Sequence, residues 1–408
     1  MKAVILAGGE GKRMHPLTYT RPKAMVYAAG RPLLWHVLLE VKKAGISEAV
    51  IIVKYKKEKI IDYFSRPENA PGMKLEFVEQ GEKYGTGGAL LSAKGKCGDR
   101  FLVIAGDIIT EASEIKKVIG AHASEIVVGA KKVENASQYG VLEIKNNKLV
   151  GIEEKPKNPK GNLINASIYA MDAGIFARLE KIAPSVREEY ALTSEIMGAD
   201  CVELSGLWMD VAYPWHLFDA QDALFLKMKA NPGKVENSTV KGKLIMEEGA
   251  EIFNSYVDEG THYIGRGAKI GPHSYLRGNN SIGAGCEIGE STTVKNSILF
   301  ENVKAKHLSY IGDSVIGESV NFGAGTQIAN FRFDEGPVSV LTGGGKVVDT
   351  GRKKMGAVVG DGAKFGVLSS VMPGKTIANN CWINSNTSVD NNIEPGGKTL
   401  RKRGNVQK

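Results

Sequence analysis

An isoleucine followed by a glycine recurs through the second half of this 408-residue chain. Six such pairs fall between Ile264 and Gly317, several of them six residues apart: Ile264-Gly265, Ile270-Gly271, Ile282-Gly283, Ile288-Gly289, Ile311-Gly312 and Ile316-Gly317. A six-residue period is typical of a parallel β-helix, in which each hexapeptide forms one side of a triangular coil and its isoleucine points into the core. The repeat therefore predicts a left-handed parallel β-helix of hexapeptide repeats.

The first half of the chain has the alternating pattern of an α/β fold. Short apolar runs predict strands at Val4–Leu6, Ala49–Val53, Leu75–Val78 and Phe101–Ile104. Between the first two, apolar side chains repeat at helical spacing from Leu33 to Val41, and Gly45 stands where that helix would stop. This alternation predicts a Rossmann-like, mostly parallel sheet covered on both faces, with its ligands at the carboxyl ends of the strands.

The change of pattern defines the predicted domains. Helical periodicity ends near Lys229, and the polar stretch Asn231–Ser238 follows it. We therefore expect a first domain over 1–229, a linker over 230–240 and the β-helix domain over 241–390.

Two further segments interrupt or follow the repeats. A glycine-rich excursion at roughly 330–351 is either a disordered insert or a substrate loop. A basic cluster from Lys398 to Gly404 predicts a frayed, solvated tail over 391–408.

The composition suits small anionic substrates. The formal net charge is +8, but the lysines are scattered and the aromatic residues are not interleaved with basic runs, so we expect no nucleic-acid partner. Four widely spaced cysteines predict buried thiols, not a zinc site or a disulfide framework. The chain has no run of about 18 or more apolar residues and no cleavage-like region near its start, so we expect a cytoplasmic protein with no membrane partner.

A glycine-rich turn follows the first predicted strand, in Leu6–Met14. Backbone N–H groups of such a turn can approach phosphate oxygens. The turn lacks the third glycine of a dinucleotide fingerprint, and Arg13 stands where a Walker motif needs a hydroxyl side chain. Arg13 and Lys23 supply two cations near the turn, which suits phosphoryl transfer because that reaction mainly needs positioning and charge stabilisation. The alternative is a surface loop with solvated charges.

The longer pattern around this turn resembles the sugar-1-phosphate nucleotidylyltransferase family. The matching residues are Leu6-Ala7-Gly8-Gly9-x-Gly11-x-Arg13-x-x-Pro16-Leu17-Thr18-x-x-x-Pro22-Lys23. The resemblance implies that the backbone of Gly8, Gly9 and Gly11 binds a nucleoside triphosphate. It also implies that Arg13 and Lys23 are catalytic and neutralise charge where the nucleotide and the sugar phosphate meet.

Further matches to the same family follow in order. Gln80, Gly85 and Thr86 resemble the segment that reads the base in uridylyltransferases, which implies UTP as the nucleotide substrate. Asp107 and Asp210 resemble the two Mg²⁺ ligands of the family, and two carboxylates with phosphates and waters make a reasonable magnesium shell. Either aspartate could instead be a helix cap or a turn residue.

The family's sugar-binding positions are matched by Gly140, Glu154, Lys155 and Asn165. Recognition of sugar hydroxyls needs paired donors and acceptors, such as a carboxylate and an amide. The resemblance therefore implies that these residues bind the sugar phosphate.

The β-helix half resembles the acetyltransferase part of bifunctional N-acetylglucosamine-1-phosphate uridyltransferases. The matching segments are Lys306–Asp313, Val320–Thr326 and Asn330. The resemblance implies that His307 is a general base, which suits the chemistry because a sugar amine must lose a proton to attack the thioester of acetyl-CoA.

The same resemblance assigns the amino-sugar site. Tyr310, Asn321 and Asn330 would position the amino sugar, and Arg277 would bind its phosphate. His273, in contrast, has no counterpart and is expected at the surface.

The chain departs from the bacterial enzymes in two places. After Asn330 those enzymes continue with Tyr-Asp-Gly, whereas this chain has Phe331-Arg332-Phe333. The segment before His307 is shorter than theirs, so one of their phosphate-binding lysines has no assigned position here. The variant loop resembles that of archaeal relatives with the same two-domain plan.

The resulting expectation is a bifunctional enzyme, and a homotrimer, that acts on sugar phosphates and nucleotides. It would acetylate glucosamine 1-phosphate or galactosamine 1-phosphate and then join the product to UTP, with Mg²⁺. Two alternatives remain: a monofunctional dTDP-glucose or GDP-mannose synthase whose β-helix is only structural, and a regulatory subunit that has lost activity.

Overall fold

The computed structural model describes residues 1–121, 124–184, 188–395 and 398–399. The predicted tail therefore lies largely outside the described residues. The chain divides into two separately packed units, and each is described by itself. Unit 1 comprises Met1–Glu10, Pro22–Met25 and Pro32–Asp210, and unit 2 comprises Gly11–Arg21, Val26–Arg31 and Val211–Lys408. Two short segments of the N-terminal sequence thus pack with the C-terminal half.

Unit 1 is built on a nine-stranded sheet with the order β5-β4-β1-β6-β11-β8-β12-β10-β9. Its strands are β1 (Lys2–Leu6), β4 (Glu48–Val53), β5 (Lys74–Glu79), β6 (Arg100–Ala105), β8 (Ile126–Lys132), β9 (Gly140–Lys145), β10 (Lys148–Glu154), β11 (Leu163–Asp172) and β12 (Asp200–Leu204). The four strands expected from the apolar runs are confirmed and pair in parallel. The rest of the sheet is mixed, because β11 runs antiparallel to both β6 and β8.

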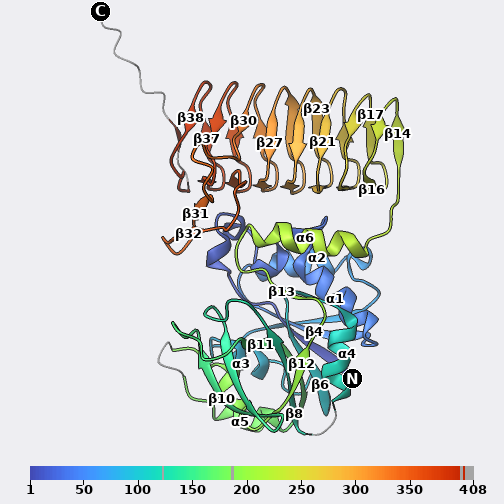
Figure 1. Cartoon of the computed structure of the whole chain (residues 1–408). Helices are drawn as coiled ribbons and strands as arrows, with labels where there is room; N and C mark the ends of the chain where they lie inside the picture. Colours follow the sequence, from blue (N-terminus) through green and yellow to red (C-terminus); the bar gives the residue numbers. More distant parts are fainter. Residues whose placement is uncertain (122–123, 185–187, 396–397, 400–408) are drawn as a thin grey trace, which may run out of the picture. The chain divides into compact units, whose positions relative to one another are not determined.

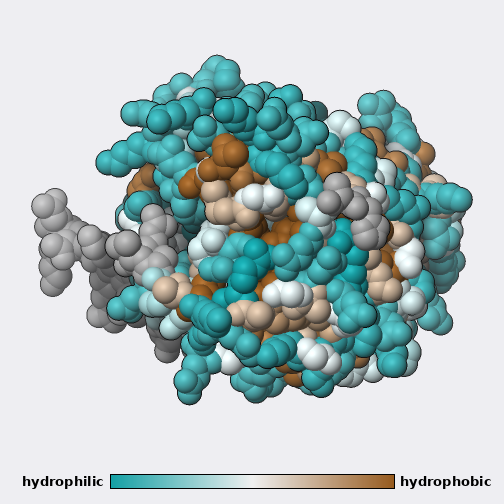
Figure 2. Space-filling view, turned by 90° about the horizontal axis from the view of Figure 1, so that it is seen from below, coloured by the Kyte–Doolittle hydropathy of each residue, from teal (hydrophilic) through white to brown (hydrophobic). Residues whose placement is uncertain are grey.

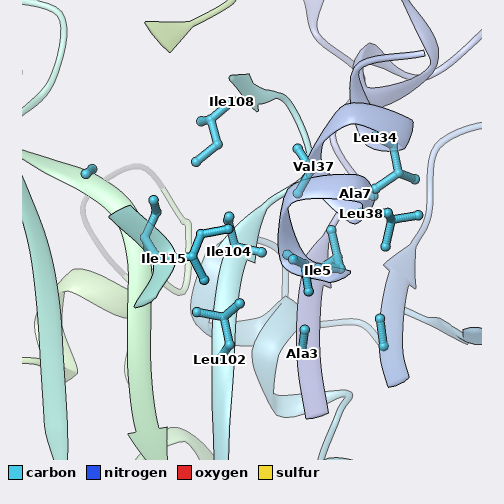
Figure 3. Close-up of a cluster of buried hydrophobic side chains, with 14 of the residues drawn as sticks. Ala3, Ile5, Ala7, Leu34, Val37, Leu38, Leu102, Ile104, Ile108 and Ile115 are labelled. Atoms are coloured by element: carbon cyan, nitrogen blue, oxygen red, sulfur yellow. The ribbon is translucent and has the colours of Figure 1, made fainter. Parts of the chain in front are cut away.

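Helices cover both faces of this sheet, as the pattern predicts. They are α1 (Leu33–Lys43), α2 (Lys57–Phe64), α3 (Thr86–Leu91), α4 (Ala112–Gly120) and α5 (Ile175–Glu180). Alternate residues of β1 point to opposite faces: Ala3 and Ile5 join the cluster of α1 (Figure 3), whereas Val4 joins the cluster of α3 and α5. The short ribbons β2 (Tyr27–Ala28), β3 (Arg31–Pro32), β7 (Ile108–Thr110) and β13 (Trp208–Asp210) complete the strands of the first half.

Unit 2 contains three stacked parallel sheets, which confirms the predicted β-helix (Figure 1). The first sheet holds β14 (Lys234–Glu236), β17 (Glu251–Phe253), β20 (Lys269–Ile270), β23 (Glu287–Glu290), β26 (Lys304–His307), β29 (Asn321–Phe322), β34 (Lys364–Phe365), β37 (Trp382–Ile383) and β39 (Lys398–Thr399). The second holds β15 (Thr239–Val240), β18 (Tyr256–Val257), β21 (Tyr275–Arg277), β24 (Thr293–Lys295), β27 (Tyr310–Gly312), β30 (Gln327–Ile328), β35 (Ser370–Val371) and β38 (Ser388–Val389). The third holds β16 (Lys243–Met246), β19 (Thr261–Ile264), β22 (Asn280–Ile282), β25 (Ile298–Leu299), β28 (Val315–Ile316), β33 (Val358–Val359) and β36 (Thr376–Ile377).

The isoleucines of the repeat form the core of the coils. Ile252, Ile270 and Ile288 occupy successive coils in register, and each has no exposed surface. The stretch expected as a linker already contains β14 and β15, which pair with the next coil. Helix α6 (His216–Lys227) precedes it.

The glycine-rich excursion is an ordered hairpin. Strands β31 (Ser339–Leu341) and β32 (Val347–Asp349) pair antiparallel, so the alternative of a disordered insert does not hold for this segment. No helix among the described residues is long and apolar enough to cross a membrane. Hydrophilic residues predominate on the face in Figure 2, interrupted by smaller hydrophobic patches.

One buried histidine makes the stability of the β-helix sensitive to acid. His262 is fully buried, with Nε2 3.0 Å from Asp258 O and Nδ1 3.2 Å from Asn280 Nδ2. A neutral ring satisfies both contacts, since one nitrogen donates and the other accepts. Burial lowers the pKa of His262 to about 4.

We predict that the free energy of unfolding falls as the pH drops from about 6.5 to about 4. In that window the unfolded chain binds a proton at His262 that the folded chain does not, so the loss reaches about 3 kcal/mol at the acid end. Denaturant unfolding at several pH values should show this slope for wild type and a smaller one for His262→Gln. Equal slopes in the two proteins would contradict the assignment.

Candidate functional sites

A cavity of about 300 Å³ lies at the carboxyl ends of β1 and β6, the place that the sheet pattern predicts for a ligand. Residues from the ends of both strands, Leu6 and Ala105, line it. The cavity brings together six of the residues singled out from sequence, namely Gly8, Gly9, Gln80, Gly85, Thr86 and Asp107.

The glycine turn after β1 lines the cavity with Gly8 and Gly9. A Cβ atom at Gly8 would come within 3.0 Å of Gln80 Oε1 and 3.2 Å of Lys54 Cβ, so a larger residue would displace its neighbours. A Cβ at Gly9 would meet nothing within 4 Å. The backbone at Gly9 therefore borders open space, where a phosphate can approach the chain closely.

Gln80 lines the same cavity, next to Gly8. Its side chain is buried, and Nε2 donates to the carbonyl oxygens of Lys83 (2.9 Å) and Gly85 (3.3 Å). Both amide hydrogens are thus engaged by the loop, which leaves Oε1 as the atom able to accept a hydrogen bond from a base.

The loop itself packs closely on a neighbouring segment. Gly85 has φ 114°, and a Cβ there would lie 2.7 Å from Tyr190 O. Thr86 Oγ1 accepts a hydrogen bond of 3.0 Å from Leu192 N. The segment predicted to read the base is therefore held on two sides.

A charged triad lies beside this cavity. The ammonium of Lys23 is 2.6 Å from Asp107 Oδ2 and 3.2 Å from Asp210 Oδ1. The antiparallel pairing of β7 with β13 explains the geometry, because it sets Asp210 opposite Ile108 and so next to Asp107. Burial disfavours charge on Lys23, but the two carboxylates outweigh it and raise the pKa of Lys23 above its usual value.

The same two carboxylates fit a divalent cation. They converge on a single positive charge, as the ligands of a bound ion do. Within the described part of the chain, no group of three or more His, Cys, Asp or Glu side chains could hold a metal. Magnesium suits such a pair, since it is commonly held by one or two carboxylates together with phosphates and waters.

Two predicted phosphate-site residues pack within unit 2. Gly11 is in the left-handed region at φ 72°, and its carbonyl accepts a hydrogen bond of 2.9 Å from Thr18 Oγ1. The guanidinium of Arg13 lies over the ring of Tyr213, 5.2 Å from its centre. The turn that carries Arg13 is therefore folded on itself and against an aromatic face.

The predicted sugar-binding residues come together on three strands. Gly140 pairs with Glu154 across β9 and β10, and a Cβ at Gly140 would lie 3.0 Å from Glu154 Oε2 and 4.0 Å from Asn165 Cβ. Lys155 follows directly, with its Nζ 3.5 Å from Glu154 Oε1. Asn165 Nδ2 donates to the hydroxyl of Tyr169 (2.7 Å), a residue that lines the cavity and whose pKa burial raises to about 12.

A second constellation lies on the β-helix. His307 ends β26, its side chain is 56% exposed, and Nδ1 is 3.4 Å from Glu290 Oε2 of the preceding coil. Tyr310 begins the next strand, and its hydroxyl accepts a hydrogen bond of 3.3 Å from Asn330 Nδ2. Asn321 lies one coil further along the sheet of His307, opposite Lys304. His273, four residues before Arg277 in the sequence, is exposed, as expected.

Sequence reasoning missed two residues of this constellation. Lys295 stands in register beside Arg277 on the next coil, and its Nζ is 2.9 Å from Asp313 Oδ2. Glu290 stands in the same way beside His307. The signal was the spacing of one coil, which stacking places side by side: 17 residues from Glu290 to His307 and 18 from Arg277 to Lys295.

Relatives of the chain span both constellations. The bifunctional protein GlmU of Methanocaldococcus jannaschii is 41% identical over 403 residues, which are 97% of this chain and 96% of the relative. The chain belongs to the GlmU-type family of bifunctional sugar-1-phosphate nucleotidylyltransferase/acetyltransferases. Another member, the bifunctional sugar-1-phosphate nucleotidylyltransferase/acetyltransferase of Sulfurisphaera tokodaii, is 41% identical over 389 residues, 92% of this chain and 94% of the relative.

Two family models and one solved structure match separate parts of the chain. A family model described as nucleotidyl transferase matches residues 2–225, and one described as GMPPB C-terminal domain matches residues 258–360. A crystal structure from Bacillus anthracis, assigned as a glucose-1-phosphate thymidylyltransferase, is 27% identical with a TM-score of 0.51 and covers 57% of this chain and 98% of its own.

Proposed function

We propose that this GlmU-type protein makes a UDP-N-acetylhexosamine in two steps. It transfers an acetyl group from acetyl-CoA to the amine of glucosamine 1-phosphate or galactosamine 1-phosphate, and then a uridylyl group from UTP to the acetylated sugar phosphate. The observation that carries the proposal is the near full-length similarity to bifunctional relatives, which spans both constellations of the chain.

Uridylyl transfer follows from the charges beside the cavity. A phosphate oxygen of the sugar 1-phosphate attacks the α-phosphorus of UTP, and the bond from that phosphorus to the pyrophosphate breaks. Lys23 and Arg13 stabilise the negative charge, and the backbone of Gly8, Gly9 and Gly11 donates hydrogen bonds to the triphosphate. Asp107 and Asp210 would hold Mg²⁺, which supplies further charge neutralisation when bound.

The choice of uracil rests on Gln80. Uracil offers one N–H donor between two carbonyl acceptors, and Oε1 of Gln80 remains able to accept from such a donor because Nε2 is used by the loop. Gly85 and Thr86 hold that loop against its neighbours. Gly140, Glu154, Lys155 and Asn165 bind the sugar phosphate, with Glu154 and Asn165 as partners for hydroxyl or amide groups.

Acetyl transfer follows from His307. The imidazole takes a proton from the sugar amine, the amine nitrogen attacks the thioester carbonyl, and the departing CoA thiolate receives a proton. Glu290, 3.4 Å from Nδ1, orients the ring. Arg277 and the adjacent Lys295 bind the phosphate, and Tyr310, Asn321 and Asn330 position the amino sugar.

A second candidate is thymidylyl transfer to glucose 1-phosphate. The 27% identity to the Bacillus anthracis structure favours it as an alternative for the first half of the chain. Pyrophosphate release with UTP, dTTP and GTP, each with several sugar 1-phosphates, separates the two. Higher kcat/KM for dTTP with glucose 1-phosphate than for UTP with any N-acetylhexosamine 1-phosphate would select the second candidate.

We predict that Asp107→Ala abolishes pyrophosphate release while CoA release continues at the wild-type rate. The change removes one metal ligand and one partner of Lys23, and both act only on the phosphates. Measuring the two products in the same sample provides the control. Equal loss of both activities in a folded variant would refute separate sites.

We predict that His307→Ala lowers acetyl transfer by a factor of about 10² to 10⁴, the usual contribution of a general base. A thiol-release assay with glucosamine 1-phosphate or galactosamine 1-phosphate measures this loss. Uridylyl transfer to an already acetylated sugar phosphate should be unchanged. Wild-type acetyl transfer in the variant would mean that the β-helix is only structural.

We further propose a homotrimer with its β-helices side by side. Apolar side chains are exposed on the coils: Leu308, directly after His307, is 59% exposed and Leu368 is 63% exposed. Contiguous exposed apolar side chains commonly mark an interface, and cyclic closure is a common solution for such surfaces.

Light scattering should therefore report three chains for wild type and fewer for Leu308→Glu/Leu368→Glu, because charges cannot be buried without partners. Val347→Glu, at an equally exposed apolar position on the hairpin (70%), is the matched control and should remain trimeric. A monomeric wild type would refute the assembly.

A further inference from the structure

The sequence motif for nucleotidyl transfer does not pack as one piece. Its segment Gly11–Arg21, which carries Arg13, belongs by packing to unit 2 together with the β-helix. We propose that Asp361, Glu318 and Gly343 of the C-terminal half are positioning residues for nucleotidyl transfer, an inference that rests on the proposed function and goes beyond its family assignments.

One end of the segment is tied by an ion pair. Arg21 is only 6% exposed, and its Nη2 lies 2.6 Å from Asp361 Oδ2 and 3.1 Å from Glu318 Oε2. The guanidinium also lies over the ring of Phe300, 5.0 Å from its centre, and over that of Tyr27 at 5.9 Å. A buried guanidinium enclosed by two carboxylates and two rings has little freedom to move.

Asp361 joins the segment to two coils at once. Its Oδ2 accepts hydrogen bonds from Arg21 and from the hydroxyl of Thr20, and its Oδ1 accepts one of 2.7 Å from Glu318 N. Gly317 makes room for this arrangement, because a Cβ there would lie 2.5 Å from Asp361 Oδ1. The carboxylate is thus fixed by the β-helix backbone before it holds Arg21.

The other end of the segment is tied by the tip of the hairpin. Gly343, between β31 and β32, packs so closely that a Cβ would lie 2.2 Å from Lys12 O and 2.4 Å from His15 Nδ1. A small cavity of about 110 Å³ beside it is lined by His15 and Tyr19 together with Leu341 and Thr342 of the hairpin. Both ends of the segment therefore rest on the β-helix unit, one on its coils and the other on the hairpin inserted between them.

The segment needs such support because it has little regular structure of its own. Two 3₁₀ turns, Lys12–Met14 and Leu17–Tyr19, are its regular elements, and the bond from Thr18 Oγ1 to Gly11 O ties them together. A displacement of about 1 Å in a group that positions reactants can cost about 100-fold in rate. Residues that hold the turn of Arg13 therefore control nucleotidyl transfer without touching a substrate.

Adjacent glycines at the hairpin tip give a matched test. Gly343→Ala must push Lys12 away and should lower kcat for pyrophosphate release on the order of 100-fold, with a smaller change in the KM for UTP, since the base still binds at Gln80. Gly344→Ala, where a Cβ meets nothing within 4 Å, should behave as wild type. Wild-type kcat in Gly343→Ala, or an equal loss of CoA release, would overturn the proposal.

A mutant cycle tests the other end. Asp361→Asn and Arg21→Gln should each lower kcat for pyrophosphate release. The kcat of the double variant should be no lower than that of the less active single variant, because both changes break the same contact. CoA release should stay at the wild-type rate throughout. Glu287→Gln, which removes a β-helix carboxylate paired with Lys306 instead, is the control and should change neither activity. Additive losses in the cycle would overturn the proposal.

Hydrogen exchange separates this inference from the proposed function. Without substrates, Gly343→Ala and Asp361→Asn should speed amide exchange in residues 11–21, whereas Gly344→Ala and Glu287→Gln should not. That result supports the anchors even if wild type releases no pyrophosphate with any nucleotide, an outcome that would refute the function alone. Unchanged exchange in both anchor variants would refute the anchors, whatever the wild-type activity.

Discussion

The in-register pairing of each coil with the next is the constraint on which the C-terminal half depends. Once Ile270 and Ile288 stack in the core, every outward position of one coil is placed beside its counterpart on the next. The pairs Arg277 with Lys295 and Glu290 with His307 follow from this stacking and need no further device. The repeat fills the core, and the same stacking arranges the polar side chains on the surface of the coils.

In the N-terminal half, the corresponding constraint is the pairing of buried charges. Lys23 is largely buried and would be costly as an isolated cation, yet Asp107 and Asp210 compensate it from two different strand ends. Each buried charge of the triad therefore has a partner of opposite sign.

Sequence patterns predicted the elements that depend on the residues of the segment itself. The apolar runs located β1, β4, β5 and β6, and the six-residue period located the coils. The antiparallel course of β11 was not predictable, because strand direction depends on pairing with distant strands and not on the composition of the strand. Lys295 was missed for a related reason: its place beside Arg277 is defined by coil length, which the comparison of linear motifs did not use. The site roles taken from the family resemblance remain predictions, although the cavity does collect Gly8, Gln80 and Asp107.

The packing of residues 11–21 with the coils makes the dependence between the two halves one-sided. The proposed acetyl-transfer constellation draws His307, Glu290 and Tyr310 from the coils of unit 2. In our proposal the nucleotidyl-transfer motif, in contrast, depends on the C-terminal half, because Asp361 contacts Arg21 and Gly343 packs against Lys12 and His15. On this proposal, acetyl transfer continues when nucleotidyl transfer is damaged, whereas the turn that carries Arg13 depends on the coils. This asymmetry gives a physical reason for both activities to share one chain, since the β-helix then serves as the catalytic frame of one reaction and as the support of the other.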